Sequence, residues 1–166
     1  MIKPVIVNAL NAQIQNEMSN AHAYQAVAVF FGHLNLHGFE AFMARQSAEE
    51  RNHAERFLRH LAARGVRAEL GAIPAPKGEF ASALEACHAV RDWERTTTDQ
   101  IHKLFDLARR EGDVALEILL HWFIAEQVEE EQWSGELSEL AGWFHERPGQ
   151  LFMLDHHWAK RMENPK

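Results

Sequence analysis

Glycine and proline divide this chain into long uninterrupted stretches, and no other feature of the sequence limits its fold as strongly. The breaks fall at Pro4, 32–38, 65–78, Gly112 and 142–149. Between them apolar residues recur every three or four positions, which is typical of amphipathic helices, and no stretch alternates as a β-strand does. We therefore predict an all-α fold with helices at 5–33, 38–64, 80–110 and 114–145, and a short fifth helix at 148–160.

The lengths of the connections predict how these helices are arranged. The connections after the first and third helices are short, so each joins antiparallel neighbours. The segment 65–79, GVRAELGAIPAPKGE, reaches roughly 50 Å at about 3.3 Å per residue, enough to run along a helix about 45 Å long. We therefore predict an up-down-down-up bundle with one long crossover, in a single domain over 1–166. A flexible tether is the alternative, but Ile73, Pro74 and Pro76 favour an ordered strap.

Composition and charge exclude several classes of protein. A chain of 166 residues, 46% apolar and 25% charged, is ordinary for a globular protein. The formal net charge of −7 disfavours binding to nucleic acid. We see neither a secretory signal in the first residues nor an apolar run long enough to span a bilayer, so we expect a cytoplasmic protein without a membrane partner. The single cysteine, Cys87, is interpreted as a small buried hydrophobe.

Polar residues interrupt the apolar stripe of each long helix near its middle. They are Glu17, Glu50, His53, Glu94, Gln127 and Glu130. A single buried carboxylate often has a partner on a neighbouring helix, but four in one layer are different, because removing each ionised carboxylate from water costs several kcal/mol. No Lys or Arg occupies these stripes. The carboxylates must therefore stay protonated or be neutralised by positive charge from another source.

Two divalent cations would supply that charge and make the layer a dinuclear metal site with His53 as its nitrogen ligand. Carboxylates with one imidazole suit iron or manganese better than structural zinc, although zinc can bind as an inhibitor. Glu50 and His53 lie one helical turn apart, so they can hold one ion while the second oxygen of Glu50 reaches the other.

At these positions the chain resembles the non-haem ferritins of bacteria and archaea, over nearly its whole length. The matching pieces are Glu17 with Tyr24, Glu49-Glu50-Arg51-Asn52-His53, Trp93-Glu94-Arg95 and Ala125-Glu126-Gln127-Val128-Glu129-Glu130-Glu131. Only the first Glu-x-x-His motif of the ferritin-like superfamily is intact. Gln127 and Glu130 stand where bacterioferritins and rubrerythrin-like proteins carry Glu and His, so the departure favours ferritin. Asn52 replaces the haem methionine of bacterioferritin, so we expect no haem and interpret Met18 and Met43 as core residues.

The resemblance implies a ferritin-like bundle whose di-iron centre lies within one subunit. Glu17, Glu50 and His53 would bind the first iron, and Glu50, Glu94 and Glu130 the second, with Glu50 as the bridge.

Gln127 resembles the family's amide near the oxygen-binding position, and Tyr24 the family's tyrosine beside the centre. A core aromatic that donates to a carboxylate would explain Tyr24 equally well. A third iron site is suggested by Glu49, Glu126 and Glu129 together with Glu130, although a solvated acidic face is the alternative.

By the same resemblance, we expect the protein to be a ferroxidase that oxidises Fe(II) with dioxygen or peroxide and stores ferric mineral in a homo-oligomeric shell of 24 subunits. The fifth helix, with Phe152, Leu154 and Trp158, would pack around a symmetry axis or against its own subunit.

Three other functions compete with this one. A peroxidase of the rubrerythrin kind lacks support, because the second Glu-x-x-His and a cysteine-rich iron domain are missing. A Dps-like shell places its metal between subunits and protects DNA, but no basic tail is present. A bundle used only for protein interaction leaves the aligned carboxylates unexplained.

Overall fold

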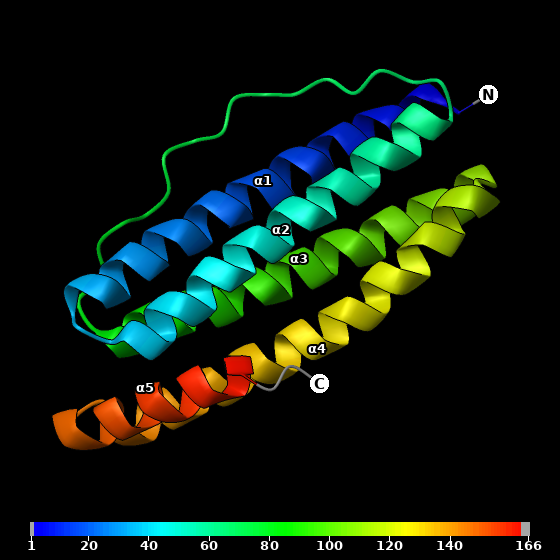
Figure 1. Ribbon diagram of the computed structural model, residues 1–166. Helices are drawn as coiled ribbons and strands as arrows, with labels where there is room; N and C mark the ends of the chain where they lie inside the picture. The colour runs from blue at the N-terminus through cyan, green and yellow to red at the C-terminus, as the bar shows by residue number, and fades with distance from the viewer. Residues whose placement is uncertain (1, 164–166) are drawn as a thin grey trace.

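The computed structural model describes residues 2–163, and the regular secondary structure in that range consists of helices, without strands (Figure 1). They are α1 (Pro4–His33), α2 (His37–Ala63), α3 (Ala83–Glu111), α4 (Val114–Phe144) and α5 (Pro148–Glu163). None of these helices is both long and apolar enough to cross a membrane. The prediction of an all-α fold is confirmed.

The long crossover is an ordered strap along α1, as predicted, and not the flexible tether that was the alternative. Gln15 Nε2 donates to the carbonyl oxygen of Ala72 at 2.8 Å, and Asn11 Oδ1 accepts from the backbone N–H of Glu69 at 3.1 Å. The strap carries the chain from the end of α2 back along the bundle to the start of α3 (Figure 1). Helices α2 and α3 therefore run parallel, which confirms the up-down-down-up order.

Local capping explains why α3 begins at Ala83 rather than at 80. Ser82 Oγ accepts from the backbone N–H of Glu85 at 3.1 Å, and the Glu85 carboxylate accepts from the N–H of Ala81 at 2.5 Å. This reciprocal arrangement fixes the helix start, and Phe80 before it turns into the core. The fifth helix also differs from the prediction, since it continues to Glu163 rather than ending near 160.

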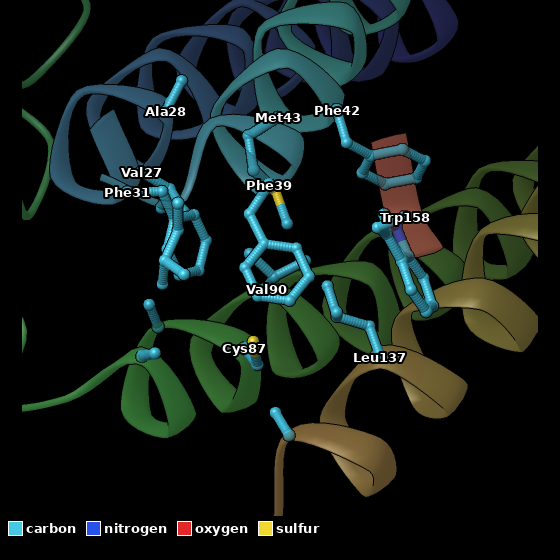
Figure 2. Close-up of a cluster of buried hydrophobic side chains, with 14 of the residues drawn as sticks. Val27, Ala28, Phe31, Phe39, Phe42, Met43, Cys87, Val90, Leu137 and Trp158 are labelled. Carbon is cyan, nitrogen blue, oxygen red and sulfur yellow. The ribbon is translucent and has the colours of Figure 1, made fainter. Parts of the chain in front are cut away.

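The core consists of two apolar clusters at opposite ends of the bundle. One, shown in part in Figure 2, contains Phe31, Phe39, Met43, Cys87, Leu137 and Trp158. The other contains Ile6, Leu10, Ile14, Phe57, Leu61, Ile101, Leu116, Leu120 and Phe123. Met43 is buried and Met18 packs against the second cluster, as predicted. Burial raises the pKa of Cys87 to about 12, which agrees with a structural role.

Helix α5 docks against the N-terminal turn of α2. Asp155 Oδ1 accepts from the backbone N–H of Phe39 at 2.7 Å, and the buried Trp158 ring lies 6.4 Å from that of Phe39. A Cβ at Gly38 would lie 2.1 Å from the carbonyl oxygen of Asp155, so only glycine allows this approach. The buried face of α5 thus packs within its own chain, while Phe152 remains 61% exposed.

Replacing Gly38 by alanine should therefore separate α5 from α2. We expect Gly38→Ala to lower the free energy of unfolding by about 1–3 kcal/mol, as overpacking does, and to expose α5 to limited proteolysis. Gly135→Ala is the control, because nothing lies within 4 Å of a Cβ at that helical position. Equal stability and equal cleavage of the two variants would contradict the docking.

Candidate metal centre

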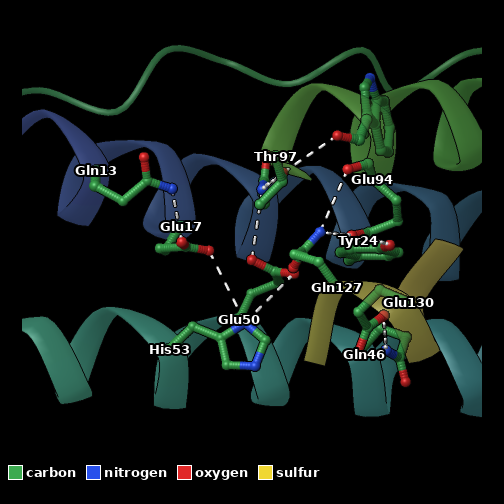
Figure 3. Close-up of polar contacts among 12 residues, drawn as sticks. Gln13, Glu17, Tyr24, Gln46, Glu50, His53, Glu94, Thr97, Gln127 and Glu130 are labelled. Atoms are coloured by element: carbon green, nitrogen blue, oxygen red, sulfur yellow. Dashed lines mark hydrogen bonds and ion pairs between the residues drawn. The ribbon is translucent and has the colours of Figure 1, made fainter. Parts of the chain in front are cut away.

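A polar layer separates the two apolar clusters, and α1 to α4 each contribute to it (Figure 3). Its buried members include Glu17, Tyr24, Glu50, His53, Glu94, Gln127 and Glu130. Each side chain reaches the layer because it occupies a position on the buried stripe of its helix. All the residues predicted for the dinuclear centre, with its amide and tyrosine neighbours, are therefore buried in one layer.

Three of these residues form a compact set of metal-type donors. Glu17, Glu50 and His53 each offer an atom within 4.8 Å of the others. His53 Nδ1 lies 3.9 Å from Glu17 Oε2 and 3.8 Å from Glu50 Oε1. Glu17 Oε2 is buried and accepts no hydrogen bond from a permanent donor in the described residues. Two carboxylate oxygens and an imidazole nitrogen thus surround one point, an arrangement that suits a divalent cation.

The two carboxylates predicted for the second metal are engaged by other donors. Tyr24 donates its hydroxyl to Glu94 Oε1, and Gln127 Nε2 lies 3.4 Å from Glu94 Oε2. Glu130 Oε2 accepts from Trp133 Nε1 at 2.6 Å and from Gln46 Nε2 at 3.2 Å. Within the described residues, these carboxylates do not join Glu50 in a second compact donor set.

Burial dominates the electrostatics of the layer. Loss of water raises the pKa of Glu50 and Glu130 well above the usual range, and the charges of Glu17 and Glu94 respectively raise them further. Burial also raises the pKa of Glu94, to about 7. His53 shifts the other way, because burial and then the charge of Arg56 lower its pKa to about 4. At neutral pH the imidazole is therefore neutral. The raised pKa values favour the protonated form of the carboxyl groups, and a bound cation would displace those protons.

Several side chains that orient these groups were not assigned a role from sequence. Gln13 Nε2 donates to Glu17 Oε1 at 2.8 Å, and Asn20 Nδ2 lies 3.4 Å from Glu50 Oε2. Gln13 lies one turn before Glu17, and Trp133 three residues after Glu130, so helical spacing was the signal that could have found them.

Trp122 and Phe123, the two aromatic side chains that contact His53, were also not identified from the sequence. The rings of His53 and Trp122 meet edge to face at 5.6 Å, and the Arg56 guanidinium lies 3.6 Å from the centre of the Trp122 ring. Phe123 contacts His53 in the same way at 5.8 Å. These contacts fix the orientation of the imidazole.

The acidic residues considered for a third metal are less tightly grouped. Glu126 is half-buried, and burial followed by the charges of Glu129 and Glu49 raises its pKa. Glu49 is paired with Arg45 at 2.8 Å, and Glu129 is exposed. The third site remains a prediction.

Comparison with known proteins identifies the family of this chain. The family model of the ferritin-like domain matches residues 7–141. The chain belongs to the ferritin family. Its relatives include the bacterial non-heme ferritin of Staphylococcus saprophyticus, 40% identical over 131 residues, which are 79% of this chain and 78% of that protein. The Staphylococcus aureus protein of the same name is 37% identical over 131 residues, 79% of each chain.

Solved structures agree with the sequence relatives. This ferritin-family chain superimposes on an open pore ferritin from the hyperthermophilic archaeon Archaeoglobus fulgidus with a TM-score of 0.93. The two are 34% identical, and the match covers 96% of this chain and 98% of the archaeal one. The resemblance stated from the sequence is confirmed for both family and fold.

The raised pKa of Glu94 predicts how stability depends on pH in the metal-free protein. A carboxyl group with a folded pKa of about 7 stabilises the fold at low pH, and this contribution is lost as pH rises through 7. The neutral Glu94→Gln variant lacks this loss. We therefore expect its free energy of unfolding, relative to that of the unmodified protein, to increase between pH 5.5 and 8. Denaturant unfolding at several pH values tests this, and a pH-independent difference would contradict it.

Proposed function

We propose that this chain stores iron by oxidising Fe(II) at the polar layer and depositing ferric mineral inside a shell of identical subunits. The observation that carries the proposal is the buried set of Glu17, Glu50 and His53 in a layer of uncompensated carboxylates. Bound cations would neutralise such a layer, whereas burying its charged carboxylates without cations costs folding free energy. Membership of the ferritin family supports iron as the cation.

In this proposal Glu17, Glu50 and His53 hold the first Fe(II). His53 needs no deprotonation at neutral pH, because its pKa is about 4. Burial raises the pKa of both Glu17 and Glu50, so a cation that binds between them would replace protons held by these carboxyl groups.

Glu50, Glu94 and Glu130 would hold the second Fe(II), with Glu50 as the bridge. Gln127 supports this half of the site: its amide lies 3.3 Å from the carbonyl oxygen of Glu94 and 3.2 Å from Thr98 Oγ1. An uncharged amide at this position can donate a hydrogen bond to a reduced oxygen species without adding charge. Glu49, Glu126 and Glu129 are proposed as a third binding place nearby.

The redox balance requires two ions in one site. Each Fe(II) gives one electron to dioxygen, which takes up two protons and leaves as hydrogen peroxide. When peroxide is the oxidant, the same two electrons and two protons convert it to two water molecules. Each iron gains one positive charge, which the surrounding carboxylates offset.

Storage also requires a closed assembly, and we propose a shell of 24 subunits. Exposed apolar side chains support an assembly, among them Val29, Leu70, Phe152 and Met153. One structural relative is itself described as an open pore ferritin.

Oxygen consumption after addition of Fe(II) tests the ferroxidase activity. We expect Glu50→Ala to slow the reaction at least 10- to 100-fold, since this variant loses the bridge, and mutation even of outer-shell groups has effects of about that size. Glu69→Ala on the exposed strap is the control and should react normally. Unchanged oxygen consumption in Glu50→Ala, or in Glu130→Ala, would contradict the proposal.

A further inference from the structure

Glu130 is held differently from the other carboxylates of the layer. Trp133 Nε1 at 2.6 Å and Gln46 Nε2 at 3.2 Å both donate to the same oxygen, Oε2. Neither donor reaches Oε1 in the described contacts. One oxygen of this carboxylate is therefore engaged by two protein donors, and the other is left for a cation.

The frame that holds these donors is rigid. Trp133 is buried, its ring packs edge to face on Phe42 at 4.9 Å, and it lies 6.4 Å from the Tyr24 ring. Gln46 is buried on α2, across the bundle from Trp133 on α4. Neither side chain can move away from Glu130 without disturbing the packing around it.

The first metal position has less competition, because in the part of the chain that the structure describes Glu17 accepts from one protein donor only, Gln13 Nε2 on Oε1 at 2.8 Å. Glu17 Oε2 accepts no hydrogen bond within the described residues, so a cation can use this oxygen without displacing a protein donor. A cation that uses both oxygens of Glu130 must instead break hydrogen bonds to a charged group, which are among the stronger ones in proteins. The two halves of the centre therefore differ in how firmly they can hold a cation.

We propose that Trp133 and Gln46 are positioning residues that restrict Glu130 to one oxygen and so keep the second iron weakly bound. This inference rests on the proposed function. An ion that is to be passed on to a mineral must leave the site after oxidation, and coordination through one carboxylate oxygen makes departure easier than coordination through two.

Calorimetric titration with Zn(II), which undergoes no redox reaction, tests the proposal on the assembled protein. We expect two binding events, the first dependent on Glu17. Trp133→Phe keeps an aromatic ring and removes the donor, so it should tighten the second event about ten-fold and leave the first unchanged. Trp143→Phe on the same helix is the matched control, because Trp143 is 63% exposed and away from the layer.

Gln46→Leu provides an independent variant and covers the case in which Trp133→Phe fails to fold. Its hydrogen bond is longer, so we expect a tightening of only about three-fold. A second readout is recovery of Fe(II) oxidation on a repeated addition of iron, which should be slower in both variants.

The outcomes separate the two proposals. A normal first event with an unchanged or weaker second event in both variants would overturn the role of Trp133 and Gln46 alone. If the unmodified protein shows no event that depends on Glu17, the dinuclear centre itself is overturned, and this inference with it. A change of equal size in both events would indicate a general structural effect and would also overturn it.

Discussion

Four carboxylates share one buried layer of this bundle, and the rest of the structure depends on how their charge is managed. Within the described residues, Glu17, Glu50, Glu94 and Glu130 form no ion pair with a Lys or Arg. Removing such groups from water costs several kcal/mol each. In the metal-free protein, raised pKa values and hydrogen bonds from neighbouring amides, a phenol and an indole reduce that cost. The apolar clusters on either side keep the layer buried, so bound cations would offset the negative charge more fully than these hydrogen bonds do.

The sequence was sufficient for the fold and for which residues enter the layer. Glycine and proline mark the ends of the helices, and the stripe position of Glu17 or Glu94 determines the face on which each lies. It was insufficient for details set by a single side chain. The start of α3 depends on the Ser82 and Glu85 cap, which the apolar period does not encode.

The same limit applies inside the site. Helical spacing predicts that Glu130 faces the core, but it does not predict that Trp133 and Gln46 both donate hydrogen bonds to its carboxylate. That contact depends on the rotamers of side chains on two helices. As a result, the donors proposed for the first iron are already grouped, whereas Glu94, proposed for the second, accepts hydrogen bonds from Tyr24 and Gln127 that a cation would have to displace.

We propose that the polar layer binds two iron ions within one subunit. Diffraction at the iron absorption edge, from crystals loaded with Fe(II) without oxygen, tests it most directly. We expect one anomalous peak among Glu17, Glu50 and His53, and a second bounded by Glu50, Glu94 and Glu130. Iron peaks elsewhere on the protein with none in this layer would contradict it.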